Sequence, residues 1–91
     1  MNKYKEASEI LKAMGHPARL QIINGIIENE CSVTEIQEKL GLPQSTISQH
    51  LKILKNSKII KGRREATRVC YKVVNKSVTE IIDIINKKTG K

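Results

Sequence analysis

The sequence predicts one mainly α-helical domain that carries a small β-hairpin. Apolar residues recur at helical spacing over most of the chain, and one stretch, residues 59–74, changes to a pattern typical of strands. The length of 91 residues leaves room for a single core, which must be aliphatic because the chain has 14 Ile, 6 Leu and 5 Val but no Phe or Trp. We therefore expect residues 1–91 to form one domain.

Two helices are expected in the first third of the chain. The first, residues 3–14, carries apolar residues at positions i, i+3, i+4 and i+7, namely Ala7, Ile10, Leu11 and Met14. Gly15 ends this helix, and Pro17 suits the first turn of the next one. The second helix is apolar on most sides, through Leu20, Ile22, Ile23, Ile26 and Ile27. We expect it to lie at the centre of the domain and to end in the polar segment 28–30.

Residues 32–55 have the pattern of a helix-turn-helix. Ser32 and Glu35, three positions apart, predict a capping box at the start of a short helix. Gly41 suits the left-handed residue that closes this helix, and Pro43 suits the start of a second one. The second helix has an inward apolar face made of Ile47, Leu51 and Leu54. Two short helices joined by a tight glycine turn are typical of this motif.

The other face of this second helix is polar in a way that suits the major groove of DNA. Amides and hydroxyls come first, and lysines follow toward the C-terminal end. Glutamine pairs with adenine, serine pairs with either kind of base edge, and lysines further along reach phosphates. A helical hairpin of another kind of protein would carry a similar face merely because it is solvated. The candidate DNA contacts on this helix are Gln44, Ser45, Thr46, Ser48, Gln49 and Lys52.

A basic β-hairpin is expected after the helix-turn-helix. Residues 59–65 and 68–74 form two runs, the second rich in β-branched and aromatic residues, with a tip at residues 65–67. Around this tip, four side chains would grip the DNA backbone or enter a minor groove: Arg63, Arg64, Thr67 and Arg68. A helix-turn-helix followed by such a hairpin is a winged helix-turn-helix.

The last segment, residues 76–88, predicts a fifth helix. Its apolar residues again follow helical spacing, at Val78, Ile81, Ile82 and Ile85, with Ile84 in addition. This is more apolar surface than one small domain needs to cover. We therefore expect the chain to complete its core by forming a homodimer through the first and last helices, residues 3–14 and 76–88.

The net charge of +8 is concentrated in one block of the sequence. Residues 1–40 hold five basic and six acidic side chains, whereas residues 41–76 hold nine basic side chains and Glu65 as the one acid. Such a block favours a polyanion, because each neutralised phosphate releases condensed counterions. Single strands and RNA are commonly bound by stacking bases on aromatic residues, and this block offers only Tyr71. Double-stranded DNA is therefore the expected partner.

Several classes of function are open to a chain of this kind. The leading hypothesis is a sequence-specific DNA-binding transcriptional repressor. An architectural or weakly specific duplex binder would spread its basic residues over several faces, and a protein-interaction module would use the terminal helices and leave the basic block incidental. An enzyme is not expected. The chain has few candidate catalytic side chains, with two cysteines and two histidines, and it shows no obvious pair of acids. Its five glycines are scattered and form no phosphate-binding loop.

The chain carries no signal for a membrane or for export. No apolar run approaches the roughly 18–20 residues that span a bilayer, and the N-terminus lacks the apolar centre of a signal peptide. We expect a cytoplasmic protein with no membrane partner. Cys31 and Cys70 are then not part of a secreted disulfide framework.

Over nearly its whole length, the sequence resembles the ArsR-type (ArsR/SmtB) family of small winged-helix repressors. The resemblance is carried by residues 11–20, 32–36, 42–54 and 63–66, and by Cys70 with Tyr71. It implies a homodimer whose two recognition helices enter successive major grooves of an inverted repeat, and an effector that releases the DNA. It also implies that Gln44, Ser45, Ser48 and Gln49 meet bases or nearby phosphates and that residues 63–68 grip the flanks. For His50 it implies packing where the helix meets the hairpin, with direct DNA contact as the alternative.

Two known metal sites of this family are not matched here. A cysteine pair spaced Cys-x-Cys is replaced by Ser32 and Thr34, and the last helix offers Glu80 and Asp83 but no histidine. Neutral imidazole is the ligand that would hold zinc or nickel at the second site. We therefore expect no metal and no other cofactor, and the sequence does not identify the effector.

Cys31 and Cys70 leave three alternatives open. In a winged helix, the stretch before the first helix of the motif often pairs with the second hairpin strand, which would bring the two cysteines within reach of a disulfide. Cys31 also resembles the first cysteine of persulfide- and oxidant-sensing members, although their second cysteine lies in the last helix. The pair is a thiol sensor, two inert buried side chains, or a two-cysteine metal or arsenic site.

Overall fold

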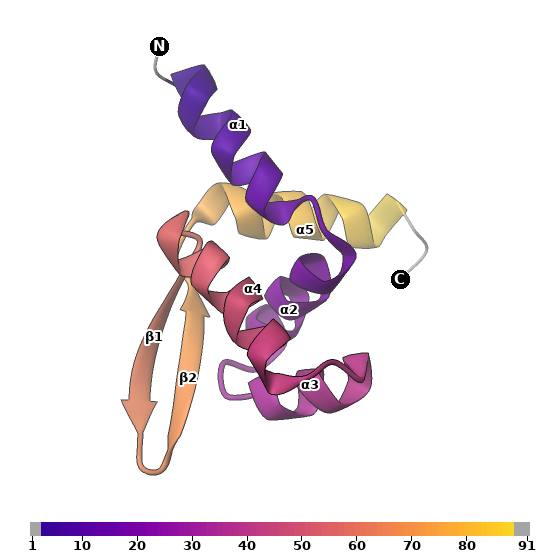
Figure 1. Cartoon of the computed structure of the whole chain (residues 1–91). Helices are drawn as coiled ribbons and strands as arrows, with labels where there is room; N and C mark the ends of the chain where they lie inside the picture. Colours follow the sequence, from indigo (N-terminus) through magenta and orange to yellow (C-terminus); the bar gives the residue numbers. More distant parts are fainter. Residues whose placement is uncertain (1–2, 89–91) are drawn as a thin grey trace.

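The computed structural model describes residues 3–88, and helix α2 (Pro17–Glu28) lies at the centre of the fold (Figure 1). Ile22, Ile23 and Ile26 of this helix are almost completely buried, at 1% exposure or less. The position agrees with a helix that is apolar on most sides. Around it lie α1 (Lys3–Met14), α3 (Val33–Leu40), α4 (Gln44–Asn56), β1 (Ile60–Glu65), β2 (Arg68–Val73) and α5 (Lys76–Lys88).

The expected mainly α fold with one hairpin is confirmed for the residues that the structure describes. These form five helices and a single two-stranded antiparallel sheet. The bounds of the first and last helices agree with the ranges that the apolar spacing predicts.

The helix-turn-helix has the geometry that its glycine and proline predict. Gly41 adopts a left-handed conformation with φ of 66°, and its N–H donates to the carbonyl oxygens of Gln37 and Glu38 at the end of α3. Pro43 precedes α4, and its carbonyl accepts the N–H of Ile47 at 3.1 Å. Ile47 is buried against the core and fixes which face of α4 points outward.

Close packing between α2 and α3 requires the glycine in the middle of α2. A Cβ atom at Gly25 would collide with the side chain of Ile36, which α3 contributes to the core. Glycine costs up to about 1 kcal/mol in a helix relative to alanine. Gly25 therefore lets the helix-turn-helix lie directly against the central helix, and α2 continues through it without a break.

The capping box expected at the start of α3 is absent. Ser32 is the N-cap residue, but its side chain makes no capping hydrogen bond to α3. Its hydroxyl donates instead to the carbonyl oxygens of Gly25 and Asn29. The buried hydroxyl of Ser32 thus has its acceptors on the preceding segment, at the carbonyl of Asn29 and at that of Gly25, which also accepts the N–H of Asn29.

The wing projects from the body of the molecule and lies beside the helix-turn-helix (Figure 1). Its strands pair from Ile60 opposite Val73 to Glu65 opposite Arg68, and Ala66 and Thr67 form the turn. Ala66 has a positive φ of 57°, which a two-residue hairpin turn commonly requires. The tip therefore lies within the expected residues 65–67.

Candidate nucleic-acid interface

The polar face of α4 is open to solvent. Ile47 and Leu54 are 2% and 0% exposed, so the residues on the opposite side of the helix point outward. Thr46 is half-buried at the edge of this face. The other candidate residues of the helix are exposed: Gln44, Ser45, Ser48, Gln49 and Lys52.

The wing carries its candidate residues along an exposed ribbon. Residues 61–69 are all exposed. Side chains of directly opposed residues share a face of the hairpin, so Arg64 lies on the face of Val69 while Arg63 lies on the face of Cys70. Among residues 3–88, neither Arg64 nor Arg68 forms an ion pair with a carboxylate.

A groove of about 490 Å³ separates the helix-turn-helix from the wing. Gln44 and Ser48 of α4 line one side of it, and Thr67 and Arg68 of the wing line the other. Cys31 also lies in its wall. Four of the predicted DNA contacts therefore surround the same groove as one of the two cysteines.

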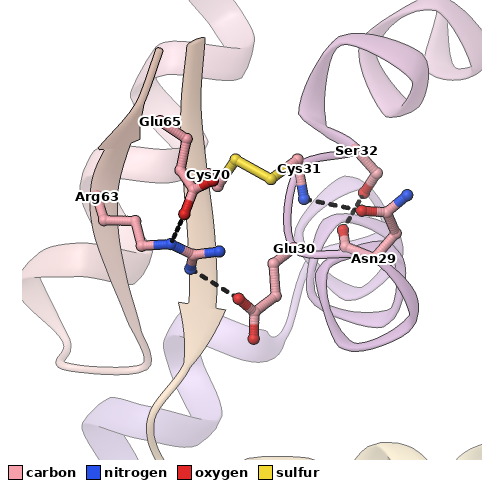
Figure 2. A network of polar contacts seen from close by, with 7 residues as sticks. All are labelled: Asn29, Glu30, Cys31, Ser32, Arg63, Glu65 and Cys70. Atoms are coloured by element: carbon pink, nitrogen blue, oxygen red, sulfur yellow. Dashed lines mark hydrogen bonds and ion pairs between the residues drawn. A yellow bond between two sulfur atoms is a disulfide. The ribbon is translucent and has the colours of Figure 1, made fainter.

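Arg63 differs from its neighbours because two carboxylates hold it. Its Nη1 lies 2.7 Å from Oε1 of Glu30, and its Nε donates to Oε2 of Glu65 at 2.9 Å (Figure 2). Hydrogen bonds to these two carboxylates raise the pKa of Arg63, and the bond from Arg63 lowers the pKa of Glu65. A phosphate would therefore compete for Arg63 with two carboxylates that already offset its charge.

Cys31 and Cys70 form a disulfide that fastens the α2–α3 turn to the wing (Figure 2). Their Cα atoms are 4.3 Å apart. The N–H of Tyr71 donates to the carbonyl of Glu30 at 2.7 Å, so the turn lies along the edge of β2. The side chain of Asn29 accepts the N–H of Cys31 at 2.9 Å and shapes the turn itself. The proximity expected for the two cysteines is thus observed.

Glu30 is the member of this network that the sequence pattern did not reveal. The available signal was the acid directly before Cys31, in the stretch expected to lie beside the second wing strand. An acid at that place faces a strongly basic hairpin, and such a pair across neighbouring strands is favourable. The partner could not be chosen from several wing cations without the register of the strands.

His50 contacts the turn between α1 and α2. Its Nδ1 lies 3.2 Å from Nη1 of Arg19, and its ring centroid is 4.7 Å from that of His16. Arg19 also donates to the carbonyl of Ala13. The expectation that His50 packs where the helix meets the hairpin is therefore corrected: its partners hold the middle of α4 against the start of α2.

A family model agrees with this arrangement. The model described as "Bacterial regulatory protein, arsR family" matches residues 16–61, which span α2, α3, α4 and the start of the wing. The chain belongs to the arsR family. This match confirms the family resemblance that the sequence motifs indicated.

Relatives of the arsR-family chain match over almost its whole length. An uncharacterised HTH-type transcriptional regulator of Methanocaldococcus jannaschii is 44% identical over 88 residues, which are 96% of this chain and 99% of that protein. The transcriptional repressor PagR of Bacillus anthracis is 39% identical over 83 residues, 90% of this chain and 83% of PagR. The structure of HlyU from Vibrio cholerae has a TM-score of 0.89 at 33% identity and covers 99% of this chain and 98% of that one. These neighbours confirm the winged helix-turn-helix fold.

The terminal helices of this arsR-family chain expose apolar side chains. Tyr4 and Leu11 of α1 are 75% and 54% exposed, and Ile84 of α5 is 56% exposed. Helix α1 buries only Ala13 and Met14 and extends away from the body of the molecule (Figure 1). The surplus apolar surface that the sequence predicts is therefore present at both ends of the described chain.

Residues 3–88 contain neither a membrane-spanning helix nor a cluster of metal ligands. None of the helices there combines the length and the apolar character of a bilayer-spanning segment. No three His, Cys, Asp or Glu side chains of this part of the chain lie close enough together to hold one metal ion.

Proposed function

We propose that this arsR-family protein is a dimeric transcriptional repressor that binds an inverted repeat in double-stranded DNA. The observation that carries the proposal is the exposed polar face of α4 beside a basic wing, on opposite sides of one groove. In a winged helix, such a helix enters the major groove and the hairpin follows the flanking backbone. The protein would thus read sequence with one element and hold the duplex with the other.

Each candidate residue has a role in this proposal. Lys52 lies further along α4 and binds phosphate, as do the wing residues. Arg63 contributes to the wing after it exchanges a carboxylate for a phosphate. The residues of α4 that read base edges in the major groove, or the phosphates beside them, are Gln44, Ser45, Thr46, Ser48 and Gln49.

Dimerisation through α1 and α5 is part of the proposal. The exposed Tyr4, Leu11 and Ile84 support it, because apolar surface that one small domain cannot cover is normally buried against a partner. A twofold dimer presents two α4 helices with opposite orientations, and these match the two halves of an inverted repeat.

The names of the relatives favour repression. PagR and the biofilm growth-associated protein of Xylella fastidiosa are named repressors, whereas HlyU of Vibrio cholerae is named an activator. We therefore propose repression that an effector relieves by releasing the DNA.

A thiol oxidant or a persulfide acting at Cys31 and Cys70 is the proposed effector. The bonded pair supports this over inert cysteines and over a two-cysteine metal or arsenic site, because a disulfide that joins the wing to the helix-turn-helix links cysteine chemistry to the DNA-binding surface. Reduction and oxidation would then alter how the wing is held.

DNA binding is tested by gel shift on an inverted repeat from the protein's own promoter region, with a scrambled duplex for comparison. Ser48→Ala or Gln49→Ala should weaken specific binding by about 1–3 kcal/mol for each base that the variant no longer reads, and should leave the scrambled duplex nearly unaffected. Lys55 is an exposed lysine in the last turn of α4, where it would meet phosphate rather than bases. Lys55→Ala is therefore the control that should weaken both duplexes alike. Equal affinity of the wild type for both duplexes would support the architectural alternative instead.

A further inference from the structure

The two halves of the disulfide differ in their access to solvent. Cys70 is completely buried, at 0% exposure, under the α2–α3 turn that lies along β2. Cys31 is only half-buried and lines the groove between the helix-turn-helix and the wing. An external thiolate reaches a disulfide through whichever sulfur is accessible. Cys31 is the member of the pair that is not fully buried and that lines the groove, so its sulfur is the expected point of attack.

The groove next to Cys31 has the size of a small-molecule site, and its lining mixes polar and apolar side chains. Its volume of about 490 Å³ lies within the roughly 300–1,000 Å³ typical of such sites. Thr34 and Gln37 supply polar groups from α3, and Arg68 supplies a cation from the wing. Glu35 is the carboxylate in the lining. A thiol of tripeptide size that carries carboxylates can place one of them near Arg68.

We propose that Cys31 is the attachment site for a low-molecular-weight anionic thiol of tripeptide size, and that the attached group fills the groove and excludes DNA. The second half of this proposal rests on the proposed function. Gln44, Ser48, Thr67 and Arg68 are predicted DNA contacts and also line the groove. A group bound there lies between α4, the proposed recognition helix, and the wing, where the DNA backbone would lie. Its negative charge also repels the phosphates of the DNA.

The attachment is a thiol–disulfide exchange. The thiolate of the small thiol attacks Sγ of Cys31, a new sulfur–sulfur bond forms, and the bond between Cys31 and Cys70 breaks. The electron pair of the broken bond leaves on Sγ of Cys70, which takes a proton from water. From the reduced protein, the thiolate of Cys31 attacks the disulfide form of the same small thiol and releases one small thiolate. Both routes give the same mixed disulfide on Cys31.

The site of attachment is tested with two variants that each keep one cysteine, Cys70→Ser and Cys31→Ser. Each is treated with oxidised glutathione, and the mixed disulfide is followed by intact-protein mass spectrometry. We expect the thiol of Cys31 in Cys70→Ser to react roughly tenfold or more faster than the thiol of Cys70 in Cys31→Ser, because access controls the exchange. Equal rates, or faster reaction at Cys70, would overturn the assignment.

Wild-type protein gives a second measurement that does not depend on how the variants fold. The disulfide-bonded protein is incubated in a buffer of reduced and oxidised glutathione and quenched with acid, and the singly modified species is digested. The glutathione should map to the peptide that contains Cys31. An adduct on Cys70, or an even division between the two, would overturn the proposal.

The effect on DNA is measured with Cys70→Ser in three states: unmodified, joined to glutathione, and joined to a methylthio group from methyl methanethiosulfonate. We expect glutathione to lower affinity for the inverted repeat roughly tenfold or more and the small methylthio group to leave it within about threefold, because only the larger group fills the groove. Equal affinity of the glutathione and unmodified forms, or an equal decrease with both groups, would refute groove filling. If the unmodified variant and the reduced wild type both fail to prefer the inverted repeat, the proposed function fails, while the mass spectrum still decides the attachment site.

Discussion

Two arginines that are adjacent in the wing have opposite surroundings. Arg63 is held by Glu30 and Glu65, whereas Arg64 forms no ion pair with a carboxylate in the described part of the chain. A cation that is already paired releases few counterions when it meets a phosphate, because binding replaces one anion by another. The two positions therefore differ in how they respond to salt.

We expect Arg64→Ala to reduce the slope of log K against log salt by about 0.9 for each phosphate that the variant no longer neutralises. Arg63→Ala should change this slope by less than half as much, even if its affinity falls because the wing is less well held. The measurement is a titration of fluorescent operator duplex at several salt concentrations. Equal changes in slope for the two variants would mean that the ion pairs of Arg63 with its two carboxylates are completely broken when the protein binds DNA.

Acid should weaken the fold through His50. Burial, followed by the charges of His16 and Arg19, lowers the pKa of His50 below 6.5. The unfolded chain then takes up a proton at a higher pH than the folded chain does. Stability contributed by neutral His50 is therefore complete above about pH 6.5 and is lost as the pH falls through the lower pKa of the folded state.

The check on His50 is urea unfolding of the wild type and of His50→Gln between pH 7.5 and pH 5, without reductant. Glutamine can accept the hydrogen bond from Arg19 but does not titrate. We expect the wild type to lose more stability than the variant over this range. Parallel pH curves would show that His50 stays neutral in both states or is protonated equally in both.

The helices and turns were predicted mainly from local signals in the sequence. Apolar spacing gave the bounds of α1 and α5, and Gly41 with Pro43 gave the turn of the helix-turn-helix. These signals depend on residues that are neighbours in the chain, so no tertiary information is needed to interpret them.

Of the tertiary contacts, the proximity of Cys31 and Cys70 was predicted, whereas the partners of Ser32 and Arg63 were not. The hydroxyl of Ser32 donates to the carbonyls of Gly25 and Asn29 rather than capping α3. Arg63 forms an ion pair with Glu30, which is 33 positions away in the chain. In each case several partners were chemically equivalent in the sequence, and only the packing of α2 against α3 and β2 selected one. The candidate face of α4 was predicted because the burial of Ile47 and Leu54 determines it. The ion pair between Arg63 and Glu30, which holds the wing against the α2–α3 turn, depends on strand register.

The outer face of α1 should hold the dimer together. Leu11 is 54% exposed in the single chain, and a carboxylate at this position would be buried without a partner in a dimer, which is costly. We expect wild-type protein to sediment at twice its 10.3 kDa chain mass and Leu11→Glu to sediment as a monomer at micromolar concentration.

The matched control for Leu11→Glu is Val69→Glu, which introduces the same charge at a side chain that is 42% exposed on the wing. This variant should remain dimeric in sedimentation. Dissociation of both variants would indicate that added negative charge, rather than the position on α1, separates the subunits.

The disulfide constrains the molecule as a whole. Cys31 and Cys70 are separated by 39 residues, and the ring that they close contains α3, α4 and β1. The recognition helix and half of the wing therefore lie within one covalent loop. In the chain-entropy model, closing a loop of this length stabilises the folded state by about 4 kcal/mol, because the unfolded chain loses freedom.

Reduction should consequently lower the melting temperature strongly. For a domain of this size, about 4 kcal/mol corresponds to a shift on the order of 15–30 °C, and it is a large part of the roughly 5–15 kcal/mol that stabilises a typical domain. The measurement is thermal unfolding by circular dichroism, with and without a phosphine reductant, at one fixed protein concentration because dimerisation also contributes. The double variant Cys31→Ser/Cys70→Ser should melt like the reduced wild type and be insensitive to the reductant. If wild type melts at the same temperature in both buffers, the folded chain gains nothing from the bond, and its role is confined to holding the turn and the wing at the groove.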